Sequence, residues 1–163
     1  MPFVAFLKID GVQGESIDST HKNEIEVMAY HWGCSQSVTG TVSSVGNISG
    51  QRVNMDSLTV TKKLDKASPL LAQNCCAGKL FPSVVLTLHR ADGNKEKYME
   101  YKLTNAMIAS VHVGGSAQGE GGVPTEEVGF AFTKIEWVYT KVGADGKPAG
   151  NTPGTWDLTK NTI

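Results

Sequence analysis

Apolar and polar residues alternate with a period of two along most of the chain, a pattern typical of β-strands with one buried face. The first alternating run covers residues 3–9 and the second runs from about residue 24 to residue 32. Residues 84–90 and 97–103 flank the sequence Ala91-Asp92-Gly93-Asn94, which is typical of a hairpin turn. Further strands are expected at residues 58–64 and 107–113. The pattern therefore predicts a mainly antiparallel β structure.

The apolar residues between positions 125 and 139 do not keep one alternation. They form two groups of opposite parity, first Val128, Phe130 and Phe132, and then Ile135, Trp137 and Tyr139. A regular strand would place the two groups on opposite faces. Either both faces are buried, or a β-bulge near residues 133–134 exchanges them. Both alternatives suit a curved sheet that closes into a barrel.

One helix is predicted at about residues 68–77. Ser68 is a favourable N-cap residue, Pro69 suits the first helical position, and Gly78 suits the position that ends a helix. The sequence contains no internal repeat and no linker. We therefore expect a single domain over residues 1–163, a closed or nearly closed antiparallel β-barrel with one short flanking α-helix.

The segment from residue 39 to residue 50 has no apolar period and almost no charge, and it is rich in Gly and Ser. It carries three spaced apolar side chains, Val42, Val45 and Ile48. Long loops in compact domains are usually functional or disordered. We expect this loop to pack against another surface, and a plain disordered connection is the alternative.

Charge and hydropathy limit the classes of partner that the chain is expected to bind. The chain has 15 basic and 16 acidic residues, a net charge of -1, so it lacks the basic field that binds nucleic acid or an anionic membrane. Its N-terminus lacks the basic and long apolar regions of a signal peptide. The longest apolar runs are also shorter than the ~18 residues that a membrane helix needs. We expect a protein that is made and folded in the cytoplasm and does not insert into membranes.

The sequence offers little that resembles an active site. Its four histidines are His21, His31, His89 and His112. No two of them have metal-ligand spacing, and a GxSxG motif is absent. His89 and His112 have the parity opposite to the apolar residues of their strands, so we expect both to face solvent. We therefore predict no catalytic, cofactor-binding or metal-binding residues.

Short motifs along residues 3–158 resemble those of one known family in composition and in order. They are residues 8–16 (KIDGVQGES), Trp32-Gly33, 66–71 (KASPLL), 124–128 (PTEEV), 134–137 (KIEW) and 156–158 (WDL). Together they are similar to the Hcp proteins, which form the tube of the bacterial type VI secretion apparatus. The resemblance implies a β-barrel with a flanking helix, assembled as a hexameric ring. Rings stack into a tube that a contractile sheath drives outward behind a spike complex at its tip.

The resemblance also implies roles for particular residues. In Hcp proteins the strand equivalent to the one that holds His31 contributes to the inner wall of the ring, so His31 is predicted to face the lumen and to contact cargo. An interior histidine is the alternative reading. Val42, Val45 and Ile48 are predicted to contact the neighbouring ring in the stack.

The implied function is that of a structural subunit, not an enzyme, which carries or chaperones small effectors in the lumen and is secreted without a signal peptide. The chain ends at Ile163 without the C-terminal toxin domain of some relatives, so it is not expected to be a toxin. Two other hypotheses are a stand-alone ligand-binding barrel and a metal-dependent or hydrolytic enzyme. The solution mass and a metal analysis distinguish these hypotheses.

Overall fold

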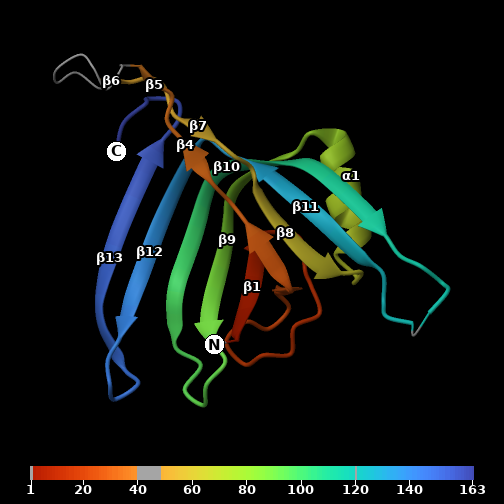
Figure 1. Cartoon of the computed structure of the whole chain (residues 1–163). Helices are drawn as coiled ribbons and strands as arrows, with labels where there is room; N and C mark the ends of the chain where they lie inside the picture. Colours follow the sequence, from red (N-terminus) through yellow and green to blue (C-terminus); the bar gives the residue numbers. More distant parts are fainter. Residues whose placement is uncertain (1, 40–48, 120) are drawn as a thin grey trace.

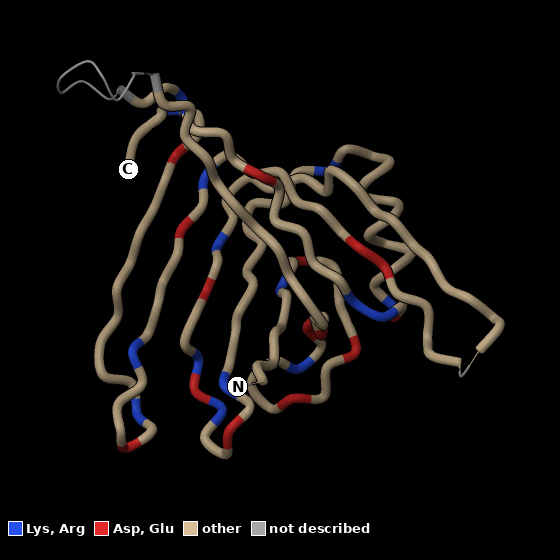
Figure 2. Tube along the Cα trace, in the orientation of Figure 1, with Lys and Arg blue, Asp and Glu red and all other residues tan. Residues whose placement is uncertain are grey.

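The computed structural model describes residues 2–39, 49–119 and 121–163, which form a curved antiparallel sheet with one helix (Figure 1). Its elements, in chain order, are β1 (Phe3–Ile9), β2 (Ile25–Val27), β3 (Ala29–His31), β4 (Cys34–Ser35), β5 (Val38–Thr39), β6 (Ser49–Gly50), β7 (Asn54–Met55), β8 (Leu58–Lys63), α1 (Ser68–Ala77), β9 (Leu80–Arg90), β10 (Lys97–Gly114), β11 (Thr125–Ala131), β12 (Lys134–Val142) and β13 (Pro148–Asp157). Basic and acidic residues are interspersed along the trace, as the small net charge implies (Figure 2).

The main sheet is built around the hairpin of β9 and β10. Its hydrogen-bonded order is β2-β1-β9-β10-β11-β8-β3, and β12 and β13 branch from β10. One edge of β10, a strand of 18 residues, pairs with β9; the other edge pairs first with β12 and then with β11. In Figure 1, β12 and β13 form a wing beside the first half of β10. The expected hairpin is confirmed, but the two strands predicted at residues 97–103 and 107–113 are one continuous strand.

The two end strands of this path, β2 and β3, are neighbours in the chain and are separated only by Met28. β2 pairs with β1, and β3 pairs with β8. The mainly β, antiparallel architecture with one helix is confirmed. A closed barrel is not confirmed, because the wing extends the sheet beyond this path and β13 pairs only with β12 among the described strands.

The sheet bends sharply where its strands exchange faces. β11 and β12 are separated by Phe132 and Thr133, and the buried residues Phe130 and Ile135 on either side have opposite parity yet belong to one core. β10 changes parity at the same level, where Asn105 has a φ of 48°. Asn tolerates this left-handed conformation better than most residues. Of the two alternatives left open for residues 125–139, the exchange of faces is the one observed, but at a two-residue interruption between β11 and β12 and not at a β-bulge within one strand.

The helix lies against β10, and its Leu71 is fully buried. It starts at Ser68, so the cap position is Ala67, one residue earlier than predicted. The side chain of Ser68 does not cap the helix, because its hydroxyl accepts a hydrogen bond from the backbone N–H of Asp65 (3.0 Å) and donates one to Glu126 (2.7 Å). Gly78 ends the helix with a φ of 61°, as predicted.

A fully buried ion pair joins the start of α1 to the sheet. Lys62 and Glu126 lie opposite each other on β8 and β11, with residue exposures of 0% and 2%. The Nζ of Lys62 contacts the carboxylate of Glu126 and also lies 2.8 Å from Oδ1 of Asp65. Charges can be buried in an apolar core only when they are paired and hydrogen-bonded, so this cluster fixes β8, β11 and α1 relative to one another.

The ion pair makes a testable prediction about stability. Lys62→Met should lower the free energy of unfolding by about 3 kcal/mol or more, because it leaves the buried carboxylate of Glu126 without a counter-ion. The double variant Lys62→Met/Glu126→Leu should recover most of this loss, as measured by urea unfolding at neutral pH. A double variant that loses as much as the sum of the two single variants would contradict the pairing.

Candidate functional site

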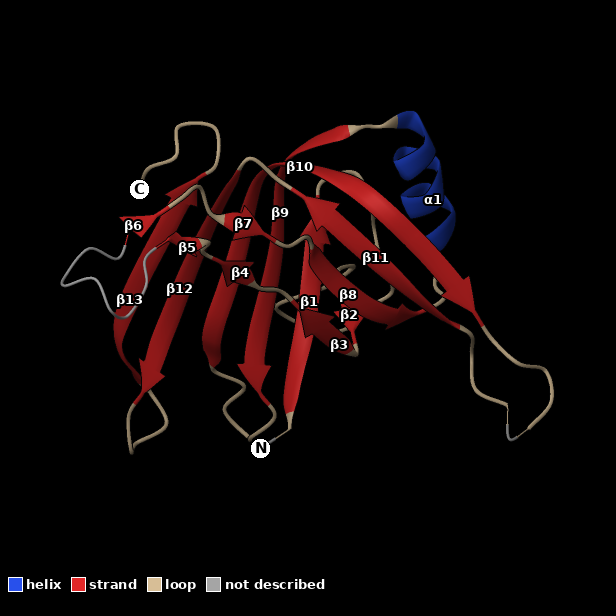
Figure 3. Ribbon diagram, turned by 45° about the horizontal axis from the view of Figure 1, so that its top comes forward, coloured by secondary structure: helices blue, strands red, loops and turns tan. Residues whose placement is uncertain are grey.

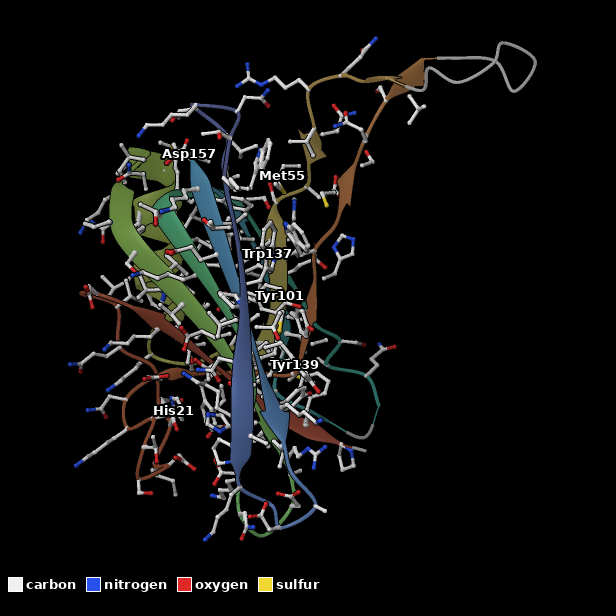
Figure 4. All side chains as sticks on the ribbon, turned by 90° about the vertical axis from the view of Figure 1, so that its left-hand side faces the viewer. His21, Met55, Tyr101, Trp137, Tyr139 and Asp157 are labelled. Carbon is white, nitrogen blue, oxygen red and sulfur yellow. The ribbon has the colours of Figure 1, made fainter. Side chains whose placement is uncertain are left out.

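One face of the wing carries a group of aromatic side chains. The pairing of β10 with β12 places Tyr101 opposite Trp137 and Met99 opposite Tyr139. Tyr30 and Trp32, in and just after β3, complete the group, with ring-centroid distances of 5.5 Å for Tyr30–Tyr101 and 5.3 Å for Trp32–Trp137. Figure 4 shows Tyr101, Trp137 and Tyr139 together on one side of the sheet. We call the five residues Tyr30, Trp32, Tyr101, Trp137 and Tyr139 the aromatic face.

The aromatic face is only partly covered by the chain itself. Tyr139 is 47% exposed, and Met28, at the same end of the sheet as Tyr30, is 53% exposed. The indole N–H groups of Trp32, Trp137 and Trp156 are buried but have no hydrogen-bond acceptor among the described residues. Buried indole N–H groups usually have a partner, and leaving one unpaired costs about 1–3 kcal/mol. The face thus combines the exposed ring of Tyr139 with half-buried aromatic residues whose indole N–H groups lie beneath the surface.

Burial favours the neutral phenol of Tyr101. The hydroxyl groups of Tyr30 and Tyr101 lie 3.3 Å apart. Burial, together with this hydrogen bond and the neighbouring phenols, raises the pKa of Tyr101 well above its usual range, and burial raises the pKa of Tyr98 in the same region. Aromatic and uncharged side chains are enriched at the centres of protein–protein contacts, which is the chemistry that this face offers.

A narrow arm projects from the main sheet beyond β3. It consists of two short two-stranded ladders, β4 with β7 and β5 with β6 (Figure 3). At its base the half-buried Met55 packs against the core, whereas Val38 further along is 57% exposed. The residues predicted to stack rings, Val42, Val45 and Ile48, come between β5 and β6 in the chain and lie outside the described residues.

The four histidines differ in burial: His31 and His112 are exposed, His21 is half-buried and His89 is buried. His31 lies on β3 opposite Thr59 and is exposed, while its neighbours Tyr30 and Trp32 pack against the core. It is therefore not an interior histidine in the single chain, and its lumen role stays a prediction. His112 is exposed, as predicted.

The prediction that His89 faces solvent is wrong. Its residue exposure is 8%, because the loop between β1 and β2 folds over this side of the sheet and brings His21 against it. Strand parity correctly assigns His89 to the side opposite the apolar core. It could not indicate that a distant loop covers that side.

Among residues 2–39, 49–119 and 121–163, no group of three or more His, Cys, Asp or Glu side chains has the geometry of a metal site. In the same residues, no helix combines the length and apolar character needed to span a membrane. What the described surface does offer is the aromatic face and the arm, which are features suited to contact with another chain.

Comparison with known proteins gives the family. The sequence model described as "Type VI secretion system effector, Hcp" matches residues 6–139. The chain is 38% identical to "Protein hcp1" of Pseudomonas aeruginosa over 158 residues, which cover 96% of this chain and 95% of that protein. The chain belongs to the Hcp family. A second Pseudomonas aeruginosa protein, "Major exported protein", is 26% identical over 86% of this chain and 83% of its own length.

Solved Hcp structures have the same fold. A structure described as that of "a type six secretion system protein" has a TM-score of 0.92 at 32% identity, with 99% of each chain covered. Hcp1 from Salmonella typhimurium has a TM-score of 0.80 at 33% identity, also with 99% of each chain covered. The curved sheet with its single helix is therefore the fold of the Hcp family over nearly the whole chain.

The raised pKa of Tyr101 predicts how this Hcp protein behaves in alkali. In the folded state the pKa of Tyr101 is raised, so its contribution to stability is complete below about pH 10 and is lost as the pH rises further. Above that pH the free energy of unfolding should fall by less than about 1.4 kcal/mol per pH unit from this group, because Tyr101 is partly exposed. Tyr101→Phe should show a smaller alkaline loss, measured by urea unfolding at several pH values. Equal losses in both proteins would refute this assignment.

Proposed function

We propose that this Hcp protein is a structural subunit of the type VI secretion inner tube, in which six copies form a ring and rings stack end to end. The observation that carries the proposal is the aromatic face, where Tyr139 is half exposed and the buried indoles of Trp32 and Trp137 lack acceptors among the described residues. Family membership supports the same function.

The contact between copies is proposed to be heterologous, in which one patch meets a different patch on the next copy. Such contacts close into a ring when the rotation between copies allows it. The aromatic face supplies one patch, and the edge of β13 that bears no partner among the described strands lies beside it. An obligate contact of this kind buries roughly 2,000 Å² or more, which keeps the ring assembled at low concentration.

In the ring, the segment of β2 and β3 is proposed to close the sheet into a barrel, because it already pairs with β1 on one side and with β8 on the other. His31 is proposed to face the lumen, where an exposed imidazole on β3 contacts small effectors without supporting the core. The subunit acts as a single domain and carries out no catalysis.

The partners proposed for the tube are further rings, the contractile sheath outside it and the spike complex at its tip. Assembly takes place in the cytoplasm, and the tube then leaves the cell through the secretion apparatus, to the extracellular space or into a target cell. The mainly uncharged aromatic face suits contact between copies better than contact with nucleic acid or lipid headgroups.

The proposed ring predicts how substitution of the exposed Tyr139 changes the mass of the protein in solution. Purified protein should have the mass of six chains in light scattering at micromolar concentration. Tyr139→Arg should shift the mass toward the monomer, because it places a charge on the aromatic face, while circular dichroism keeps the β spectrum of a folded subunit. Tyr139→Phe is the matched control and should keep the mass of six chains.

Two results would count against the proposal. Wild-type protein that stays monomeric at micromolar concentration would favour a stand-alone binding domain. A Tyr139→Arg variant that remains hexameric would show that the aromatic face lies outside the contact between subunits.

The stacking loop gives a second prediction, based on its composition. Replacing Val42, Val45 and Ile48 with Ser should leave rings intact but impair tube growth and secretion, because each apolar side chain buried at a contact contributes roughly 1.5–3 kcal/mol. Electron microscopy of tubes and recovery of the protein from culture medium measure the two effects. Normal tubes and secretion would remove the role in stacking, and loss of the ring would place the loop in the lateral contact.

A further inference from the structure

The side of the sheet opposite the aromatic face is covered by the loop between β1 and β2. His21, in this loop, stacks on Phe6 of β1 with the ring centroids 4.5 Å apart and the planes 7° apart. Figure 4 shows His21 on the other side of the sheet from Tyr101 and Trp137. The loop therefore buries Phe6 and His89, whose residue exposures are 7% and 8%.

A chain of three short contacts runs through both imidazoles. Nδ1 of His21 lies 2.7 Å from Oε2 of Glu24. Nε2 of His21 lies 2.6 Å from Nε2 of His89, and Nδ1 of His89 lies 2.7 Å from the backbone carbonyl oxygen of Lys95. All four ring nitrogens are thus engaged, and the chain connects the loop, β9 and the turn between β9 and β10.

Counting protons fixes the total charge of the three linked side chains, Glu24, His21 and His89. A carbonyl oxygen and a carboxylate can only accept, so each Nδ1 must carry a proton, and the contact between the two Nε2 atoms needs one more. Three protons on two rings make one imidazole and one imidazolium. If the Glu24 carboxyl holds one of them instead, the total is unchanged. Either way the chain binds one proton more than two neutral imidazoles and a carboxylate.

We propose that Glu24, His21 and His89 form a clasp that holds one extra proton and fastens the loop between β1 and β2 to the outer side of the sheet. A second extra proton would place hydrogen on both Nε2 atoms, which then repel each other at 2.6 Å. Loss of the extra proton would leave one acceptor without a donor. The clasp is therefore complete in one protonation state only, and acidification releases the loop.

The charges around the clasp come from two elements. The loop contributes Asp18 and Glu24, and the turn and the start of β10 contribute Lys95 and Lys97. Backbone N–H donation from Thr20 and the ammonium group of Lys95 lower the pKa of Asp18 to about 2, so this carboxylate stays charged in mild acid. The acid response therefore does not come from Asp18.

The direction of the pH effect follows from how many protons each state binds. In the unfolded chain two ordinary imidazoles together hold one proton near pH 6.5, as many as the clasp holds. Below that pH the unfolded chain binds more protons, so stability falls with acidification; above it the clasp binds more, so stability falls as the pH rises. Burial and the nearby His21 lower the pKa of His89, which agrees with the loss in acid.

The proton count can be read directly on the wild-type protein. Nitrogen-15 NMR of the imidazoles near pH 6.5 should show protonated Nδ1 on both His21 and His89 and a proton shared between their Nε2 atoms. His31 and His112 are exposed and supply the reference signals. Two neutral rings with both Nε2 atoms unprotonated at this pH would overturn the proposal.

Stability then tests whether the clasp fastens the loop. The ratio of the unfolding constants of His89→Gln and wild type should be largest near pH 6.5. It should fall roughly tenfold by about pH 5 and by about the same factor by about pH 8. His112→Gln is the matched control, because it removes an exposed histidine without these contacts, and its ratio should stay near one. A His89→Gln ratio that does not vary with pH would overturn the clasp.

Release of the loop has its own measurement. Amide hydrogen exchange of wild-type protein, expressed as protection factors, should show residues 15–23 losing protection between about pH 6.5 and 5 while β9 and β10 keep theirs. This experiment needs no variant, so it stands even if His89→Gln fails to fold. Unchanged protection of the loop in acid would show that the clasp does not control it.

Discussion

Hydrogen bonding along both edges of β10 is the constraint on which the rest of the structure depends. One strand of 18 residues has β9 on one side, and on the other side it serves β12 with its first half and β11 with its second. A long flat strand could not do this and also bury one continuous core. The left-handed Asn105 and the two-residue interruption between β11 and β12 bend the neighbouring strands at the same level. The bend keeps apolar residues of both parities in a single core.

The bend also gives the two sides of the sheet different roles. On the outer side, the chain covers itself, because the loop after β1 folds back over Phe6 and His89. On the side of the wing, the chain supplies Trp137 and Tyr139 but does not cover them fully. One sheet thus carries a surface that the subunit closes alone and another that has the chemistry of a contact with a second chain.

The features that follow from local chemistry could be predicted from the sequence. The turn at residues 91–94, the end of the helix at Gly78 and the exchange of faces between Phe130 and Ile135 each depend on a few neighbouring residues. The environment of His89 could not be predicted, because it is set by His21, which is 68 positions away in the chain. The helix cap was placed one residue late for a related reason: Ser68 bonds to Glu126 on β11, a partner that no local pattern reveals.

The candidate site also combines features set by neighbouring residues with features set by residues far apart in the chain. Tyr30 and Trp32 pack against the core while His31 between them is exposed, as the alternation of side chains along a strand implies. It could not bring Trp32 to 5.3 Å from Trp137, since that contact requires the curvature of the whole sheet. The residues that give the aromatic face its character were therefore visible in the sequence only as members of separate strands.

The aromatic face connects folding with assembly. An unpaired buried donor costs about 1–3 kcal/mol, and the half-exposed ring of Tyr139 leaves apolar surface in contact with water. A ligand that binds the folded state stabilises it by an amount that grows with the logarithm of its concentration, and a second copy of the chain acts in the same way. In the proposed ring, the subunit would gain stability by covering the exposed part of the aromatic face. The buried pair of Lys62 and Glu126, by contrast, lies wholly within one chain and links β8 to β11 without any second copy.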